Sequence, residues 1–160
     1  MGKKQQDNHS PRIVNRRAFH EFHISEVLEV GVVLVGSEVK SIRNGQASLA
    51  EGYAQVEPAT MELFLYDVNI AQYQHAAASS GHEPTSRRKL LAHKQQISKL
   101  MGLTSARGVT LVPMALYFVR GHIKLELGVG QGKKYHDKRQ SIKQRDAKRE
   151  IDRAMTRKRI

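Results

Sequence analysis

Cysteine and tryptophan are both absent from the 160 residues of this chain, and only 6% of the residues are aromatic. Without cysteine the chain can form no disulfide, no thiolate zinc site and no cysteine nucleophile, which suits a reducing compartment. No apolar run approaches the roughly 20 residues that a membrane helix needs, and residues 1–10 lack the apolar core of a signal peptide. We therefore expect a cytoplasmic protein that makes no membrane contact.

Acidic residues are scarce, and the excess of positive charge lies at the two ends of the chain. Lys and Arg number 27 against 15 Asp and Glu, a net charge of +12. Residues 131–160 carry 12 basic and 4 acidic side chains and residues 1–23 carry 5 and 2, whereas residues 24–130 carry 10 and 9. This distribution is typical of a protein that binds a polyanion. The alternative is a solvated surface that promotes solubility. Nucleic acid is favoured, because clustered like charges repel one another unless a partner neutralises them.

No motif for catalysis or for a cofactor stands out. The glycines and lysines of residues 128–134 suggest a phosphate-binding loop, but Leu127 and Lys134 stand where that loop requires a glycine and a hydroxyl residue. His20 and His23 have no acidic pair nearby at metal-ligand spacing, and the sequence G-x-S-x-G is missing. We therefore predict no enzyme, no metal and no cofactor. The glycines would let the backbone approach RNA, or would form a flexible exit from a strand.

Short β-like segments dominate the first 130 residues. Period-two alternation and apolar runs bounded by glycine predict strands, and residues 70–80 are expected to be an irregular loop. The pattern becomes β-like from Phe19, and the predicted strands cover residues 30–35, 53–56, 62–68, 109–119 and 122–129. About six short strands favour a small antiparallel barrel over alternating βαβ units.

Two helical segments are expected within this body. A short one is predicted over residues 37–43, closed by Asn44-Gly45. A longer one is predicted over residues 87–101, ended by Gly102. Arg87 to Lys89 would crowd the first turn of the longer helix with positive charge, which the helix dipole disfavours. This cost makes them candidate phosphate contacts.

The C-terminal segment differs in character from the body. Residues 138–160 contain few large apolar side chains, so they cannot bury enough surface to fold alone, and we expect them to be disordered in isolation. However, neither Gly nor Pro follows Gly132, and Ala147, Ile151, Ala154 and Met155 fall on one helical face. This pattern predicts a helix that forms on a polyanionic partner.

Four segments, in this order along the chain, resemble the SmpB (SsrA-binding protein) family, and the resemblance covers essentially everything from Asn15 to the tail. The segments are Asn15–Phe22 (NRRAFHEF), Gly36–Arg43 (GSEVKSIR), Pro84–Leu91 (PTSRRKLL) and Gly132–Arg139 (GKKYHDKR). The family pattern has Asp, Arg and Lys where Glu83, Ser86 and Gln46 stand here. Ser86 and Gln46 remove positive charge relative to that pattern and could weaken individual phosphate contacts.

The resemblance implies a mostly β fold: an antiparallel barrel of the oligonucleotide-binding (OB) type with flanking short helices. Residues 1–14 would be a flexible lead, residues 15–132 the RNA-binding barrel, and residues 133–160 a basic tail that becomes helical on the ribosome. The barrel would hold the tRNA-like domain of transfer-messenger RNA. The tail would enter the decoding centre and the empty mRNA channel of a stalled 70S ribosome, which is rescued by trans-translation. Elongation factor Tu would take part indirectly, through the charged RNA.

Individual residues are assigned to these two surfaces by the resemblance and by their charge. The RNA-binding surface would comprise Asn15, Arg16, Glu29, Glu38, Lys40, Arg43, Arg87, Lys89, Leu91, Lys124, Lys133 and Lys134. The residues at the decoding centre and in the inserted tail would be Tyr135, His136, Asp137, Lys138, Arg139, Ile151 and Met155. Tyr135 and His136 could also stack on bases, although spacing alone fits a solvated histidine in a basic linker equally well.

Two other function classes fit parts of the sequence. A ribosomal or ribosome-associated protein, with a globular body and a basic extension that binds rRNA, has the same composition. An RNA-processing enzyme would need a cluster of acidic residues or metal ligands, which the sequence does not present.

Overall fold

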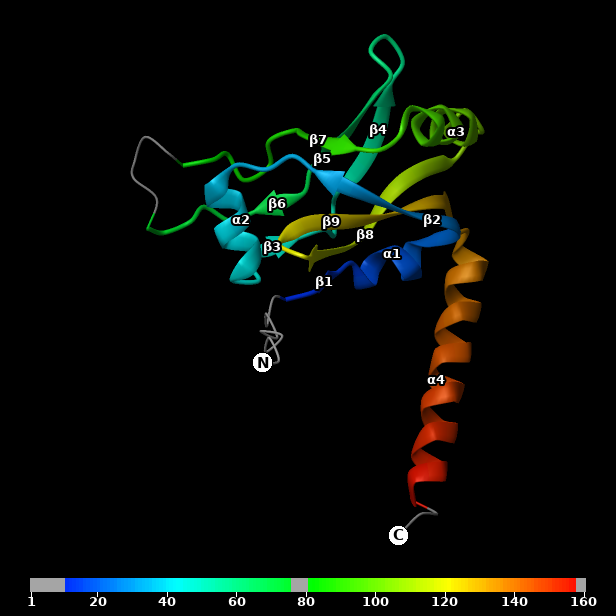
Figure 1. Ribbon diagram of the computed structural model, residues 1–160. Helices are drawn as coiled ribbons and strands as arrows, with labels where there is room; N and C mark the ends of the chain where they lie inside the picture. Colours follow the sequence, from blue (N-terminus) through cyan, green and yellow to red (C-terminus); the bar gives the residue numbers. More distant parts are fainter. Residues whose placement is uncertain (1–10, 76–80, 158–160) are drawn as a thin grey trace, which may run out of the picture.

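The computed structural model describes residues 11–75 and 81–157 (Figure 1). Nine strands and four helices follow one another along these residues. In chain order they are β1 (Ile13–Val14), α1 (Arg16–Glu21), β2 (Phe22–Val32), α2 (Gly36–Arg43), β3 (Ala47–Ser48), β4 (Tyr53–Glu57), β5 (Glu62–Tyr66), β6 (Asn69–Ile70), β7 (Arg88–Leu91), α3 (Lys94–Thr104), β8 (Val109–Val119), β9 (His122–Gly132) and α4 (Tyr135–Arg157).

Six antiparallel strands close into a barrel. The strand order is β8-β4-β5-β7-β2-β9, and β9 pairs back with β8, so the sheet has no free edge along this circuit. β1 adds to the other edge of β8, and β3 pairs with β6 in a separate small sheet. The predicted antiparallel barrel is therefore confirmed.

The core is aliphatic and follows the alternation of the strands. Leu63, Leu65, Leu111, Leu125 and Leu127 are at most 1% exposed, because every second residue of a barrel strand points inward. Helix α3 lies across one end of the barrel (Figure 1) and adds Ile97 and Leu100 to this core. The absence of tryptophan is thus compensated by close packing of leucine, isoleucine and valine.

The hairpin from β8 to β9 confirms the predicted strands and their turn. Strand residues Val119 and His122 pair directly, which leaves Arg120 and Gly121 as a two-residue loop. Both have positive φ, 49° and 83° respectively. Two consecutive positive values match the right-handed twist of a hairpin, and glycine adopts them at little cost.

The predicted long helix begins later than expected, since residues 88–91 form strand β7 instead. Arg88 and Leu90 point inward while Lys89 and Leu91 point outward, a period of two that the helical assignment had missed. The helix α3 starts at Lys94, where the Gln96 side chain accepts a hydrogen bond of 2.9 Å from the His93 N–H. It continues through Gly102 to Thr104. The expected N-terminal crowding of the helix by three basic residues is therefore wrong.

Other boundaries also differ from the sequence prediction. Residues 16–21 form helix α1, although the β-like pattern was expected to begin at Phe19. Asn15 caps this helix, since its Oδ1 accepts a hydrogen bond of 3.2 Å from the Ala18 N–H. Strand β2 ends at Val32, so residues 33–35 lie beyond it, and part of the predicted loop, residues 76–80, falls outside the described residues.

Arg88 points into the barrel because Glu38 of α2 meets it there. Their side chains are 2% and 5% exposed, and Arg88 Nε donates to Glu38 Oε1 at 2.7 Å. The same guanidinium donates to the carbonyl oxygens of Val68 and Pro84 at 2.7 and 2.9 Å. The other carboxylate oxygen of Glu38 accepts from the Val35 N–H at 2.9 Å. One ion pair therefore joins α2, β7 and two loop segments.

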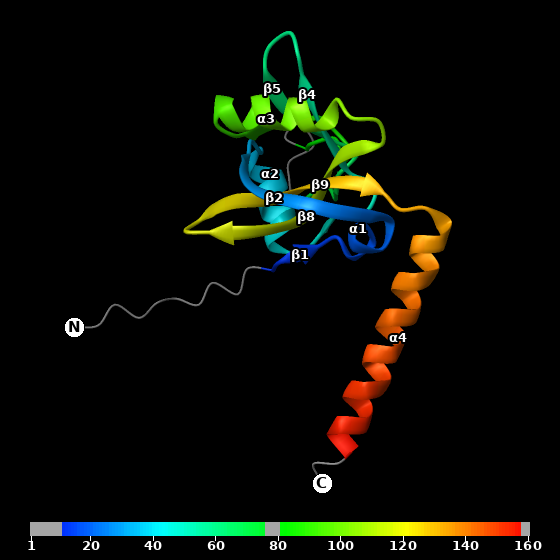
Figure 2. The ribbon, with the colours of Figure 1, turned by 90° about the vertical axis from the view of Figure 1, so that its right-hand side faces the viewer.

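The tail follows the barrel as one continuous helix. Helix α4 spans 23 residues and extends away from the barrel from the end of β9 (Figure 2). The predicted helical propensity of this segment agrees with the structure. The expected disorder of residues 138–160 in the isolated protein stays a prediction.

We predict that Glu38→Ala lowers the free energy of unfolding by about 3–5 kcal/mol, because it leaves the Arg88 charge buried without its carboxylate partner. Glu26→Ala is the matched control: Glu26 pairs with Lys99 on the surface, at side-chain exposures of 41% and 59%, and its loss should cost less than about 1 kcal/mol. Urea denaturation followed by circular dichroism measures both. Equal stabilities of the two variants would contradict a structural role for the buried pair.

Candidate nucleic-acid interface

Four of the predicted RNA-binding residues lie together on the outer face of β7, β2 and β9. Leu91 pairs with Gly31, and Gly31 pairs with Lys124. Lys89 and Glu29 lie two residues along their strands from Leu91 and Gly31, and therefore on the same face of the sheet. The barrel thus unites residues from three segments that are far apart in the sequence.

Gly31 lies in the middle of this face. A Cβ atom added there would approach the Cβ of Leu91 to 3.2 Å, so the missing side chain lets Leu91 lie close across the sheet. Leu91 remains 53% exposed. An exposed aliphatic side chain over a glycine provides an apolar surface on which a base or ribose can rest.

Tyr117 of β8 extends the same row of residues. It pairs with Lys124, and its hydroxyl donates a hydrogen bond to Glu29. Lys124 Nζ lies 3.9 Å from the other oxygen of Glu29. Burial raises the pKa of Tyr117 to about 12, with a further contribution from the hydrogen bond to Glu29 and its negative charge. The hydroxyl therefore keeps its proton and holds the carboxylate of Glu29 in place.

Arg12 completes the row beyond Tyr117, since the pairing of Ile13 with Leu116 brings the residue before β1 next to Tyr117. Its guanidinium lies over the Tyr117 ring, 4.6 Å from the centroid, and its Nη2 is 2.8 Å from both carboxylate oxygens of Glu126. Arg12, Tyr117 and Glu126 were not recognised from sequence. The two-residue strand β1 gave no pattern strong enough to place Arg12.

Other predicted basic residues rest on aromatic rings. The guanidinium of Arg87 lies 4.3 Å from the centroid of Phe64, and that of Arg43 lies 5.6 Å from Phe118. Lys40 Nζ is 5.2 Å from the centroid of Tyr73. Such contacts fix the side chains of basic residues while leaving their charge in solvent. They are suited to contact phosphates.

Two residues assigned to the RNA surface have their side chains in the interior. Asn15 is 4% exposed, and its Nδ2 donates to the carbonyls of Leu49 and Pro113 at 3.0 and 2.9 Å. Glu38 is buried and engaged by Arg88. Both side chains are engaged within the protein, and a direct contact of either one with RNA stays a prediction. Arg16, by contrast, is exposed in the first turn of α1.

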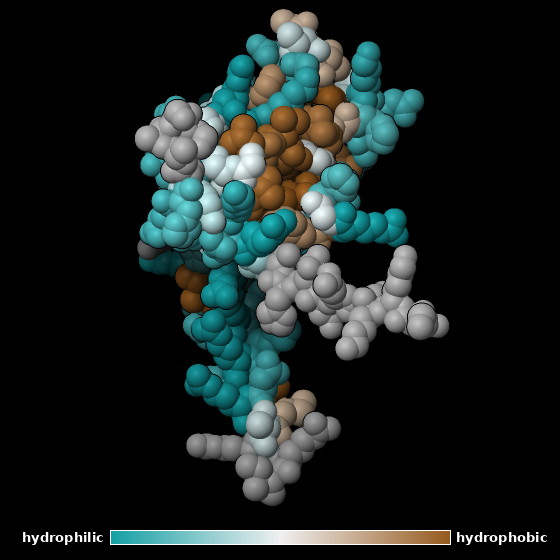
Figure 3. Space-filling model, turned by 60° about the vertical axis from the view of Figure 1, so that its left-hand side comes forward, coloured by the Kyte–Doolittle hydropathy of each residue, from teal (hydrophilic) through white to brown (hydrophobic). Residues whose placement is uncertain are grey.

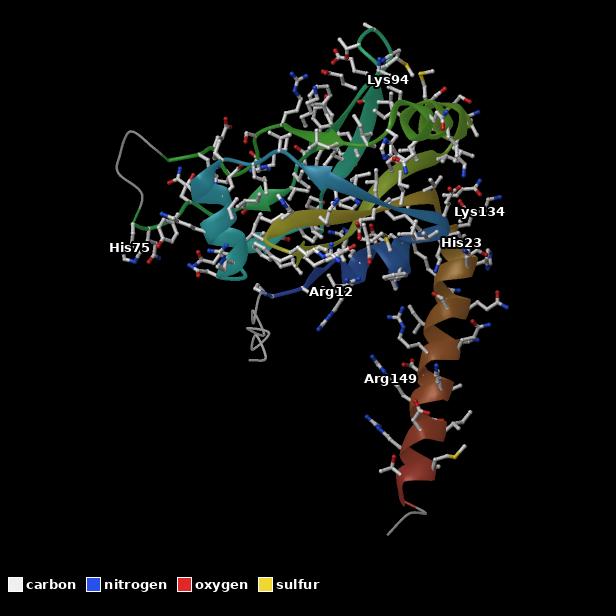
Figure 4. The ribbon with its side chains drawn as sticks, viewed as in Figure 1. Arg12, His23, His75, Lys94, Lys134 and Arg149 are labelled. Carbon is white, nitrogen blue, oxygen red and sulfur yellow. The ribbon has the colours of Figure 1, made fainter. Side chains whose placement is uncertain are left out.

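The junction between barrel and tail is held by contacts with α1 and β2. The Lys133 N–H donates to the Glu21 carbonyl at 2.8 Å, and Lys133 Nζ donates to the Phe19 carbonyl at 2.9 Å. Asp137 Oδ2 accepts from the Lys134 N–H at 3.3 Å and lies 3.5 Å from His23 Nε2. Figure 4 shows His23 and Lys134 close together where the tail begins. These contacts set the direction in which α4 leaves the barrel.

The predicted ribosome-contacting residues lie along α4. His136 and Arg139 are exposed, and Asp137 and Lys138 are half-buried near the junction. Tyr135 is the first residue of the helix. Ile151 and Met155 are 57% and 68% exposed, an apolar pair one turn apart with no covering partner in the part of the chain that the structure describes.

The hydropathy of the surface is uneven. Figure 3 shows hydrophobic side chains gathered on one face of the barrel and surrounded by hydrophilic ones.

Among residues 11–75 and 81–157, we find no group of three or more His, Asp or Glu arranged to hold a metal ion. Within the same ranges, no helix combines the length and apolar character of a membrane span.

Comparison with known proteins identifies relatives along nearly the full length. The SmpB protein family matches residues 12–157. An SsrA-binding protein of Syntrophobacter fumaroxidans is 46% identical, with 91% of this chain and 88% of that protein covered. The SsrA-binding protein of Trichodesmium erythraeum is 45% identical, with 97% and 98% covered.

A solved structure shares the fold. It is described as "tmRNA-SmpB: a journey to the center of the bacterial ribosome" and is 39% identical, with a TM-score of 0.67 over 79% of this chain and 87% of the other. The outer face of β7, β2 and β9 therefore belongs to a barrel with close relatives in sequence and in structure. The chain is a member of the SmpB family.

Proposed function

We propose that this protein binds the tRNA-like domain of transfer-messenger RNA and delivers it to stalled 70S ribosomes for trans-translation. The observation that carries the proposal is the face formed by Lys89, Leu91, Glu29 and Lys124, which joins phosphate-binding, apolar and hydrogen-bonding groups on one rigid surface. The relatives in sequence are SsrA-binding proteins, and the similar structure is named for tmRNA and SmpB in the bacterial ribosome.

The two parts of the chain divide the work in this proposal. Residues 15–132 bind the RNA, with residues 1–14 as a flexible lead, and residues 133–160 form the tail that enters the decoding centre and the empty mRNA channel. The exposed side chains of α4 support this division, because a basic helix with an uncovered apolar pair is suited to a site lined by RNA phosphates and protein.

The mechanism is recognition without covalent chemistry. The barrel and tail replace the parts of a tRNA that transfer-messenger RNA lacks, and basic residues neutralise phosphates. Elongation factor Tu contributes indirectly by carrying the charged RNA, and the protein acts in the cytoplasm.

We expect the purified protein to bind transfer-messenger RNA more tightly than an elongator tRNA, with the preference persisting as salt is raised. A rigid face recognises shape, whereas contacts between Lys or Arg and phosphate weaken with a logarithmic slope of about −0.7 to −0.9 per contact. Fluorescence anisotropy over a salt series measures both affinities. Equal affinities that fall together would contradict the proposal and favour a ribosomal protein that binds rRNA.

Removal of the tail after Gly132 should leave affinity for free transfer-messenger RNA within a few-fold of the full chain and abolish peptide tagging on stalled ribosomes. The barrel keeps its closed sheet in this variant, since β9 ends at Gly132. Loss of RNA binding on truncation would refute the division between barrel and tail.

The variant His136→Ala should fold normally, bind free RNA like the parent and show reduced tagging, because this exposed imidazole can stack on or hydrogen-bond to rRNA bases. Gln140→Ala, exposed one turn further along α4, is the matched control and should tag normally. Tagging in a reconstituted translation system is the measurement. Equal activity of both variants would argue against a role for His136 in the decoding centre.

A further inference from the structure

Several exposed basic residues of the barrel are paired with carboxylates. Four such pairs lie on β2, β5, β7, β9 and their neighbours. They are Arg12–Glu126, Lys89–Glu62, Lys99–Glu26 and Lys124–Glu29. A phosphate that approaches one of these cations must therefore compete with a carboxylate that is already present.

The pair of Arg12 and Glu126 has the most defined geometry of the four. A single guanidinium nitrogen lies 2.8 Å from both carboxylate oxygens, and the ring of Tyr117 supports the guanidinium from below. Arg12 remains 51% exposed and Glu126 30% exposed, so solvent and ligands reach both. Figure 4 shows Arg12 extending from the body of the barrel. The charge of Arg12 is accessible, but its Nη2 already donates to Glu126.

Glu126 also faces Glu29 directly across β2 and β9. Two carboxylates in cross-strand register repel one another, a cost that a sheet carries only when other groups compensate it. Here Arg12 compensates Glu126, and Tyr117 and Lys124 compensate Glu29. The arrangement places two negative charges next to Gly31 and Lys124, on the face that binds a polyanion in the proposed function.

From this arrangement, which rests on the proposed function, we propose that Glu126 is a specificity-determining residue. It holds Arg12 over Tyr117 and offsets its charge, so that an RNA gains the full attraction of this cation only when the carboxylate moves away. An RNA already held by the rest of the face places its phosphate there at high effective concentration and displaces Glu126. An RNA that fits poorly does not displace Glu126, and the charge of Arg12 stays offset.

The test is the isosteric variant Glu126→Gln, with binding of an elongator tRNA and of transfer-messenger RNA measured over a salt series. Affinity for the elongator tRNA should rise by about two- to fivefold, the range that an exposed ion pair is worth. Its salt slope should steepen by about one phosphate contact, 0.7 to 0.9. Affinity for transfer-messenger RNA should change less, so the preference falls.

Two further variants separate release of Arg12 from a general gain of positive charge. Glu57→Gln makes the same charge change elsewhere on the barrel, at a carboxylate that accepts a hydrogen bond of 3.4 Å from the Thr60 hydroxyl. This variant should not alter the preference for transfer-messenger RNA. In the Arg12→Ala background, Glu126→Gln should have less than a twofold effect on elongator tRNA, because the freed cation is no longer there. Thermal melts verify that each variant is folded.

The proposal is overturned if Glu126→Gln leaves elongator tRNA binding unchanged, weakens binding of both RNAs, or acts equally with and without Arg12. Weakened binding of both RNAs would mean that Glu126 only holds Arg12 in place. If the parent protein itself shows no preference for transfer-messenger RNA, the proposed function is contradicted. The parent measurement therefore distinguishes failure of the function from failure of the role of Glu126.

Discussion

The buried ion pair between Glu38 and Arg88 is the interaction on which the arrangement of the barrel depends. It turns the Arg88 side chain inward, and the alternation of β7 then places Lys89 and Leu91 on the outer face. The same guanidinium holds the segments at Val68 and Pro84, and Glu38 fixes the start of α2. An internal charge, costly to bury alone, thus determines which residues of β7 face a ligand.

The outer face is built by strand register and not by any local motif. Residues from β7, β2, β9 and β8 meet because their Cα atoms are paired, and the glycine at position 31 allows close approach at the centre. Its charges are balanced in pairs, whereas the tail carries a large positive excess. In the proposed function the barrel therefore recognises free RNA through a shaped and nearly neutral surface, and the excess positive charge of the tail serves its contacts with the ribosome.

The sequence predicts much of this structure, and the exceptions have physical reasons. The β8–β9 hairpin, the β4–β5 pair and α2 carry strong periodicity or turn signals, and all were anticipated. Strand β7 was mistaken for the first turn of a helix because an inward-facing arginine hides its apolar alternation, and its partner Glu38 is 50 residues away. Asn15 was assigned to the RNA-binding surface by the resemblance, and nothing in the sequence signals that its side chain is buried and caps α1. Pairing between Arg12 and Glu126 spans 114 residues and has no local signal.

The single helix of the tail acts as a rigid lever about the junction at Lys133 and Lys134. From Tyr135 to Met155 the helix rises by about 30 Å, at 1.5 Å per residue. A rotation of about 10° at the junction therefore moves Met155 sideways by about 5 Å, close to one helical turn. The few hydrogen bonds that join Lys133 and Asp137 to α1 and β2 thus control, at long range, where the far end of the tail arrives.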